Sequence, residues 1–236
     1  MSALRQSSHN VKAADAGAAP SSCDRVGRII VALEGAYGPR GFASRGRAVD
    51  VLVETVLSQN TSDVNSHRAF EALLARFGTL EEVVGARIDD IERTIANAGL
   101  SRIKSVRIKE ILTRLARENG SLDLSFLADK DVDAARGYLA SFRGVGLKTA
   151  SCVLLFSLGM PAMPVDTHVH RVSLRLGLIG PRVSAEAAHS ELEAIVKPED
   201  RYRFHILLIE HGRRVCHARN QKCGTCMLNA LCPSRL

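Results

Sequence analysis

The sequence predicts an all-α fold, and three observations support this. Apolar residues recur at helical spacing over most of the chain, as at Val49, Val53 and Val56 and again across 88–95. No segment alternates apolar and polar residues with a period of two. No Asn-Gly or Asp-Gly hairpin signal lies between apolar runs, so strands are not indicated.

Apolar stripes and end signals place the individual helices. Two further stripes cover 69–77 and 103–115, and Gly99 stands where the 88–95 helix would end. Thr79 followed by Glu82 fits a capping box, which starts a short helix. Later helices are expected at roughly 131–141, 147–158, 167–177, 184–196 and 200–212.

Two segments interrupt the helical pattern most clearly. They are Gly-Pro-Arg-Gly at 38–41 and Gly-Met-Pro-Ala-Met-Pro at 159–164. Nearly continuous helix lies between them. This arrangement predicts one helical bundle inserted between the two ends of the chain.

Charge and hydropathy limit the classes of function. The 236 residues carry a net charge of +7, which favours a polyanionic partner, with nucleic acid first. A solvated basic surface without a target is the alternative. No apolar stretch approaches the roughly 18 residues of a membrane span. The first 22 residues lack an apolar h-region and are interpreted as a flexible tail, so we expect a cytoplasmic protein, associated with the nucleoid in a bacterium.

Four cysteines lie close together near the C-terminus with the spacing C-x6-C-x2-C-x5-C: Cys216, Cys223, Cys226 and Cys232. In a reducing compartment, metal ligation is favoured over disulfide bonding. Structural zinc usually takes two C-x2-C pairs, whereas this loop has one pair and two single cysteines. The spacing therefore favours an iron–sulfur cluster, with zinc as the alternative. Cys23 is left over in the tail, and Cys152 is interpreted as a buried core residue.

A glycine-containing turn precedes a lysine at 142–149. Gly144 and Gly146 allow a tight turn, and the following helix presents free N–H groups that can bind an anion. The segment is not a nucleotide-binding P-loop, because Leu147 stands where that motif needs glycine. A plain helix–helix turn with a solvated lysine is the alternative interpretation.

Lys148 and Asp166 are the candidate reactive residues. An amine in the first turn of a helix lies at the positive end of the helix dipole, which favours its neutral, nucleophilic form. Asp166 precedes another predicted helix, where it could act as an N-cap. A carboxylate beside such an amine could accept protons and stabilise a developing cationic sugar.

Taken together, these motifs resemble the endonuclease III family of helix-hairpin-helix DNA glycosylases. The resemblance runs from about residue 25 to 232, and its motifs occur in the same order: 144–150, 165–168, 211–213 and the cysteine loop. It implies a base-excision-repair enzyme that removes damaged bases, with oxidised pyrimidines expected, and cleaves abasic sites as an AP lyase. Lys148 would be the Schiff-base nucleophile, Asp166 the catalytic carboxylate, and the four cysteines the ligands of a [4Fe–4S] cluster.

The resemblance also implies two lobes. After a tail at 1–23, residues 24–48 and 160–236 would form the cluster lobe. Residues 49–159 would form a six-helix barrel, with the helix-hairpin-helix at about 136–157. The expected partner is double-stranded DNA containing damaged bases or abasic sites, bound by a monomer.

DNA contacts follow from the same resemblance. The hairpin would bind backbone phosphate, and a side chain of the 57–63 segment would fill the space left by the flipped base; both Gln59 and Asn60 are candidates. Arg219 and Lys222 would contact phosphate from the cysteine loop. The basic group at 102–109 resembles a backbone-contacting loop, with a solvated helix face as the alternative. The full set of expected DNA contacts is Gln59, Asn60, Gly144, Val145, Gly146, Thr149, Arg219 and Lys222.

Several features depart from the family pattern. Phe142-Arg143 replaces the usual Leu-Pro before the hairpin, and the 57–63 segment differs from the usual Leu-Ser-Ala-Gln-Ala-Thr-Asp. Two other functions therefore stay open. One is a monofunctional mismatch glycosylase, which Lys148 disfavours because a water-based mechanism needs no amine there. The other is a non-catalytic iron–sulfur protein that binds DNA or senses redox state.

Overall fold

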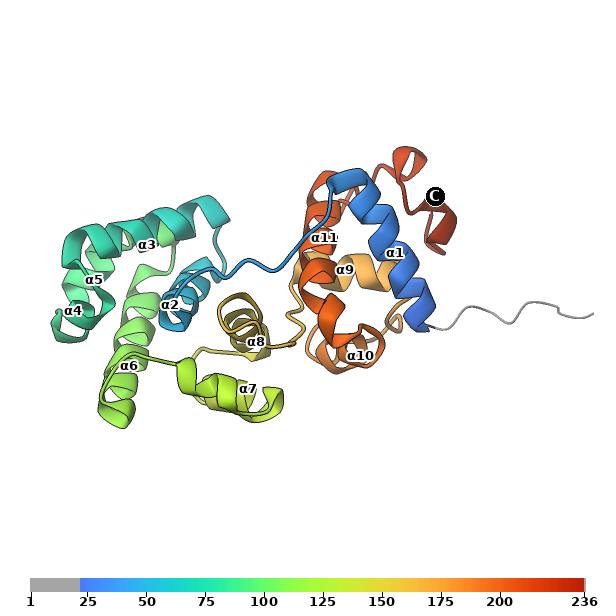
Figure 1. The fold of residues 1–236 in the computed structure, drawn as a ribbon. Coiled ribbons are helices and arrows are strands. Elements are labelled where there is room, and N and C mark those ends of the chain that lie inside the picture. Colours follow the sequence, from blue (N-terminus) through green and yellow to red (C-terminus); the bar gives the residue numbers. More distant parts are fainter. Residues whose placement is uncertain (1–21, 236) are drawn as a thin grey trace, which may run out of the picture.

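The computed structural model describes residues 22–235, and their regular structure is helical throughout (Figure 1). The all-α prediction is therefore confirmed. None of the described helices is both long and apolar enough for a membrane span. The α-helices are α1 (Ser22–Tyr37), α2 (Ala48–Ser58), α3 (Asp63–Phe77), α4 (Leu80–Gly85), α5 (Ile88–Thr94), α6 (Ser101–Asn119), α7 (Val132–Ala140), α8 (Leu147–Phe156), α9 (Thr167–Arg175), α10 (Ala187–Ile195) and α11 (Arg201–Arg214).

Two hydrophobic cores divide the described chain. One core is built from buried residues between Ala48 and Ala162, on α2 to α8 and their connections, and we call this part the barrel lobe. The other draws on α1 and on residues from Met163 to Leu228, and we call it the terminal lobe. Figure 1 shows the two lobes side by side, with α1 packed beside α11 although they are far apart in sequence.

The two segments that break the helical pattern lie at the two crossings between the lobes. The crossings are hydrogen-bonded to each other, because the Arg45 amide donates to the Phe156 carbonyl at 2.8 Å and the Ser157 hydroxyl donates to the Gly46 carbonyl at 2.5 Å. Phe42 packs edge-on against Tyr202 of α11, with ring centroids 5.3 Å apart. The two crossings are thus held to each other by hydrogen bonds, and an aromatic contact packs the first crossing against α11.

Polar side chains at the helix starts match the sequence signals. The Thr79 hydroxyl accepts from the Glu82 amide at the start of α4, as the capping box predicts. Gly99 has a φ of 64° and ends the short 3₁₀ turn 96–98 after α5.

Two boundaries differ from the prediction. The helix α1 begins at Ser22, so Cys23 lies in its first turn rather than in a tail. The rest of the expected tail lies outside the described residues. The barrel-lobe core extends beyond the predicted 49–159, because it includes Ala48, Met160 and Ala162.

Close packing of α9 and α11 depends on one glycine. A Cβ atom added to Gly212 would lie 2.9 Å from Nδ1 of His168 and 3.0 Å from its Cβ. Such distances are below van der Waals contact, so a larger residue would force the helices apart. Gly212 therefore sets how closely α11 approaches α9, the helix that Asp166 begins.

Candidate active site between the two lobes

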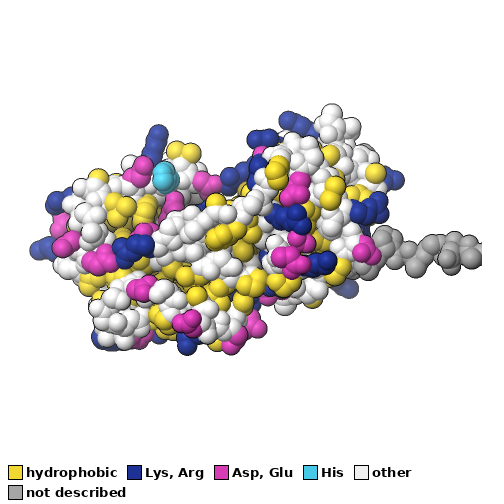
Figure 2. All heavy atoms as spheres, viewed as in Figure 1, with side chains coloured by type: hydrophobic (Ala, Val, Ile, Leu, Met, Phe, Trp, Pro, Cys, Tyr) yellow, Lys and Arg dark blue, Asp and Glu magenta, His cyan; other side chains and the backbone are white. Residues whose placement is uncertain are grey.

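A cleft of about 680 Å³ lies between the lobes and contains both candidate reactive residues. Lys148 reaches it from the first turn of α8, and Asp166 from the start of α9. The outline in Figure 2 is notched between the lobes, and Lys and Arg side chains lie along this upper edge on both sides. The structure thus brings together two residues that are separated by a whole helix in sequence.

The hairpin turn 143–146 determines how Lys148 enters the cleft. Gly144 has a φ of 83°, a left-handed backbone that favours glycine. Gly146 is the N-cap of α8 and supplies no side-chain cap, so the first amides of the helix stay available. One turn into α8, Cys152 lies buried beside Lys148 on the cleft wall, and burial raises the pKa of its thiol. The expected burial of Cys152 is confirmed.

Asp166 caps α9, as its position in the sequence suggests. Its Oδ1 accepts a hydrogen bond of 2.7 Å from the Val169 amide. Among the described residues, no hydrogen-bond partner is found for the second carboxylate oxygen. One oxygen therefore fixes the orientation of the carboxylate and the other remains available for chemistry.

His205 of α11 lies on the same cleft wall and is 1% exposed. Its Nδ1 donates to the Pro164 carbonyl at 2.9 Å, and its ring packs edge-on against Phe156. Burial lowers its pKa to about 4, with the Asp166 carboxylate acting in the opposite direction. The imidazole is therefore neutral at pH 7, and it ties the segment before Asp166 to α11.

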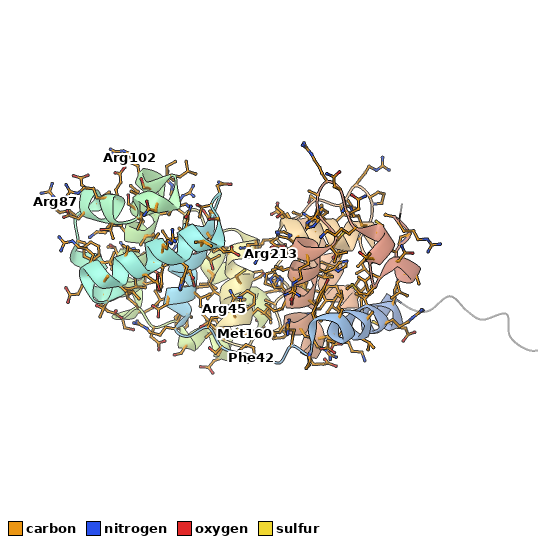
Figure 3. All side chains as sticks on the ribbon, turned by 90° about the horizontal axis from the view of Figure 1, so that it is seen from above. Phe42, Arg45, Arg87, Arg102, Met160 and Arg213 are labelled. Carbon is orange, nitrogen blue, oxygen red and sulfur yellow. The ribbon has the colours of Figure 1, made fainter. Side chains whose placement is uncertain are left out.

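Arg45, from the first crossing, lies over the apolar part of the cleft. Its guanidinium is 4.0 Å from the centre of the Phe156 ring. Figure 3 shows Arg45 and Arg213 between the lobes, whereas Arg87 and Arg102 lie at the far end of the barrel lobe. Arg45 was not predicted from the sequence, because nothing in its local pattern distinguishes it from other surface arginines.

Arg213 closes one side of the cleft with an ion pair across the lobes. Its guanidinium contacts the carboxylate of Asp63 at the start of α3. Both side chains are largely exposed, so the pair contributes little to stability. Its effect is to place a charged contact where the two lobes face each other.

Gln59 and Asn60 have different environments. The Gln59 amide donates to the Gly144 carbonyl at 2.9 Å, and its oxygen accepts from Arg107 at 3.1 Å. Asn60 is exposed and has a left-handed backbone with a φ of 53°. Gln59 is thus held against the hairpin, whereas Asn60 projects from the turn.

Two of the residues that we expected to contact DNA already have polar groups in contact with other groups of the protein. The Val145 amide donates to the Phe142 carbonyl at 3.0 Å inside the hairpin turn, so it is not free to bind phosphate. Thr149 is buried, and Gln59 approaches its hydroxyl at 3.5 Å. Within the hairpin turn, Arg143 and Gly146 are exposed and Gly144 is half-buried.

Leu100 is a feature that the sequence analysis missed. It is 54% exposed and has a φ of 49°, which is rare for a leucine. It stands at the tip just before α6, next to the exposed Ile103. The available sequence signal was its position directly after Gly99, outside the apolar stripe of the following helix.

The basic group on α6 is not a uniform solvated face. Lys104 is buried, and its ammonium donates to the Leu57 and Ala98 carbonyls, each at 2.7 Å. Lys109 donates to the Val84 and Ala86 carbonyls. For Lys104 both sequence interpretations are therefore wrong, since a buried ammonium neither contacts phosphate nor lies in solvent.

The four cysteines of the C-terminal loop line one cavity in the terminal lobe. Burial raises the pKa of the Cys226 thiol, and the three neighbouring cysteines act in the same direction. Within residues 22–235, no three His, Cys, Asp or Glu side chains converge closely enough to hold a single metal ion. The four thiols therefore share the lining of one cavity.

Side chains of neighbouring helices hold this loop. Arg175 donates to Sγ of Cys216 at 3.3 Å and to the His217 carbonyl at 2.6 Å. His211, the first residue of the His-Gly-Arg motif, approaches Sγ of Cys226 at 3.6 Å through Nε2. Arg219 and Lys222 are exposed on the loop, as a phosphate contact would require.

The fold and the cleft define a helix-hairpin-helix DNA glycosylase architecture, and the sequence comparisons agree. Residues 53–198 match the family described as HhH-GPD superfamily base excision DNA repair protein. The chain therefore belongs to the HhH-GPD superfamily. It is 36% identical to endonuclease III of Thermotoga maritima, over 77% of this chain and 81% of that protein. The resemblance to endonuclease III is confirmed.

Other relatives are longer than this chain. An Arabidopsis thaliana protein whose name marks it as a proposed DNA glycosylase is 39% identical over 70% of this chain, and the match spans 56% of that protein. The DNA glycosylase/AP lyase ROS1 of the same plant is 32% identical over 62% of this chain, which corresponds to 12% of ROS1.

Solved structures show the same fold. A non-covalent endonuclease III–DNA complex superposes with a TM-score of 0.76 at 26% identity, covering 89% of this chain and 94% of that one. A thermostable thymine-DNA glycosylase superposes with a TM-score of 0.75 at 19% identity, over 89% of this chain and 96% of that one. At that identity, the second similarity concerns the fold alone.

Proposed function

We propose that the chain is a DNA glycosylase with AP lyase activity that acts on damaged bases in double-stranded DNA. The observation that carries the proposal is the convergence of Lys148 and Asp166 in one cleft between the lobes. An amine and a carboxylate on the walls of one cleft are the pair that a Schiff-base glycosylase needs.

In the proposed reaction, Lys148 Nζ attacks C1′ of the flipped nucleotide. The N–C1′ bond forms as the bond from C1′ to the base breaks, and the base leaves with a proton. The bond from C1′ to the ring oxygen O4′ then breaks, O4′ takes up the proton that the attacking nitrogen releases, and C1′ becomes the carbon of an imine. The free oxygen of the Asp166 carboxylate stabilises the positive charge that develops on the sugar. The resulting imine then loses a proton from C2′, and the bond from C3′ to the 3′ phosphate breaks. Asp166 is the proposed proton acceptor in these steps.

DNA would approach the barrel lobe at its projecting turns. The Gly144 and Gly146 amides, with the first free amides of α8, offer an anion site for a backbone phosphate. Asn60 is the proposed residue that fills the gap left by the flipped base, because Gln59 is already engaged. Leu100 is proposed as an apolar wedge between bases, a use that DNA-bending proteins make of exposed leucines.

We propose that the cleft takes a base that carries carbonyl oxygens. Arg45 holds N–H donors over the ring of Phe156, and it lies close enough to act electrostatically on the buried His205. A guanidinium pairs with acceptor oxygens and stacks on planar rings. An oxidised pyrimidine, the expected substrate, belongs to this class of bases.

The donor set of the cysteine loop fits a [4Fe–4S] cluster. Its four thiols line one cavity, and thiolates are the ligands that such clusters take. Cys216, Cys223, Cys226 and Cys232 would hold the cluster. When bound, the group would supply a rigid, redox-capable centre, while Arg219 and Lys222 would contact phosphate nearby.

Borohydride trapping tests the proposal. Duplexes with one oxidised pyrimidine, one mismatch or one abasic site are incubated with wild-type protein, with Lys148→Gln, and with the surface control Lys130→Gln. We expect a covalent adduct with the wild-type protein and the control, and none with Lys148→Gln. Base release without any adduct would indicate a monofunctional glycosylase. Binding without base release or adduct would indicate a non-catalytic DNA-binding protein.

A further inference from the structure

The buried ammonium of Lys104 lies beneath two of the turns that would enter DNA. Burying an ammonium is costly unless it is hydrogen-bonded, and here Nζ has two carbonyl partners at 2.7 Å. One partner is Leu57, in the last turn of α2 and three residues before Asn60. The other is Ala98, two residues before Leu100. A single side chain thus connects the bases of two turns from different parts of the chain.

Both turns have strained backbones. Asn60 and Leu100 are two of only three non-glycine residues with positive φ among residues 22–235. Such conformations are unfavourable for residues with a Cβ atom, more for leucine than for asparagine, and they persist where the surroundings impose them. The Lys104 hydrogen bonds fix the carbonyls that precede each strained residue. They are therefore placed to maintain both conformations.

Arg107 extends the connection to the hairpin one turn further along α6. Its Nη1 donates to the Gln59 side chain at 3.1 Å. Its guanidinium also fills the space beside Gly144, where an added Cβ would lie 2.6 Å from Nε. Gln59 in turn donates to the Gly144 carbonyl. Arg107, Gln59 and Gly144 thus form a closed set of contacts between α6, the Asn60 turn and the hairpin.

We propose that Lys104 and Arg107 are positioning residues that fix the relative placement of Asn60, Leu100 and the hairpin turn for insertion into DNA. The inference rests on the proposed function, because it assigns these three elements to the DNA face. Inserting side chains into a base stack requires unstacking of the bases, which is unfavourable. A protein whose inserting residues are already ordered avoids a further entropic cost on binding.

Lys109 offers a matched control on the same helix. Like Lys104, it donates from α6 to two carbonyls, but these belong to Val84 and Ala86 at the joint between α4 and α5. Neither carbonyl lies within three residues of an exposed residue with positive φ. Lys104→Met and Lys109→Met each remove two hydrogen bonds that a lysine donates, so both should lower stability. Only Lys104→Met should also disturb the positions of Asn60 and Leu100.

The experiment combines three readouts. Fluorescence of 2-aminopurine beside a tetrahydrofuran abasic analogue in a duplex reports base unstacking and needs no chemistry. Borohydride trapping on a single-stranded abasic oligonucleotide reports the Lys148 amine without any insertion. Thermal unfolding reports stability. We expect Lys104→Met and Arg107→Met to lower the fluorescence change and duplex base excision at least 10-fold, with single-strand trapping within about 3-fold of the wild type.

Lys109→Met should lower the melting temperature while leaving the fluorescence change intact. Equal losses for Lys104→Met and Lys109→Met, or no loss for Lys104→Met and Arg107→Met, would overturn the positioning role. If Lys104→Met does not fold, Arg107→Met decides the result, since that side chain is only half-buried. Failure of wild-type protein to trap either substrate would refute the proposed function, and the fluorescence change would still decide the positioning role.

Discussion

The barrel lobe and the cysteine loop of the terminal lobe are held together by different forces. The barrel lobe has a large apolar core contributed by α2 to α8. In the loop 216–232, the fully buried core residue is Leu228, and the regular structure consists of the turns 223–225 and 229–231. Arginines of preceding helices donate to its carbonyls, including Arg25 to Leu231 at 2.8 Å. The barrel lobe is thus stabilised by its own apolar core, whereas the loop is held by side chains around it, together with the cluster that we propose its thiols bind.

Removing the cofactor that the cysteines would hold should have the largest effect. Because ligand binding to such a loop is part of its folding free energy, we expect the loop to open while the barrel lobe stays folded. Limited trypsin digestion of loaded and chelator-treated protein, followed by mass spectrometry, measures this. New cleavage should appear between 216 and 232, with the barrel lobe protected. Equal digestion of both lobes would contradict the proposed difference between the barrel lobe and the cysteine loop.

Asp166→Asn should separate chemistry from stability at the boundary between the lobes. Asparagine caps a helix about as well as aspartate, so the melting temperature should stay close to that of the wild type. Base release should fall by about 10²- to 10⁴-fold, the usual contribution of a group that transfers protons. The matched control is Asp131→Asn, which alters the equivalent cap of α7 (Asp131 Oδ1 to the Ala134 amide, 2.8 Å) outside the cleft. Single-turnover base release that is lowered equally by both substitutions would contradict the assignment.

Acid should weaken the terminal lobe before the barrel lobe. Burial lowers the pKa values of His189 and His205 to about 4, from 6.5. The unfolded chain therefore binds more protons than the folded one between these values, so stability is complete above about pH 6.5 and falls as the pH approaches 4. At pH 5 the free energy of unfolding is lower by about 2 kcal/mol for each histidine. The only histidine in the barrel lobe is the exposed His67.

Hydrogen exchange at pH 7.5 and 5.0, corrected for the intrinsic rate, measures this difference. We expect α10 and α11 to lose protection at pH 5.0 while α2 and α8 keep theirs. His189→Gln should reduce the loss in the terminal lobe. If both lobes lose protection equally, the histidines do not account for the acid sensitivity.

Gly212→Ala should have the smallest effect and should be confined to the terminal lobe. The added methyl group would overlap His168, which typically costs about 1–3 kcal/mol. Gly27→Ala in α1 is the control, since an added Cβ there meets nothing within 4 Å and alanine favours a helix. Urea unfolding should show Gly212→Ala as less stable than wild type, and Gly27→Ala as equal or more stable. A stable Gly212→Ala protein would mean that α9 and α11 adjust freely.

The sequence predicted those features that depend on local pattern. Helical periodicity and two proline- and glycine-rich breaks were sufficient for the all-α class and for the two crossings between the lobes. Lys148 and Asp166 could be found because each stands at the start of a helix, next to a recognisable turn. Local signals of this kind do not depend on how the lobes pack.

Features that depend on packing across the chain were missed. Arg45 matters because it meets Phe156, more than a hundred residues later, and no local pattern reports that contact. Lys104 was interpreted as a surface charge, yet it shares a helical stripe with Ile108, Ile111 and Leu115, all of which are buried. A lysine within an apolar stripe was the available signal. Its two carbonyl partners could be identified only from the folded chain.

Mass spectrometry of the borohydride-trapped complex tests the central claim most directly. The claim is that the cleft between the lobes presents the amine of Lys148 to the sugar of a flipped nucleotide. Proteolysis of the trapped complex should yield one peptide that carries the sugar remnant, with the modification on Lys148 and no cleavage after it. A remnant on any other lysine would contradict the account.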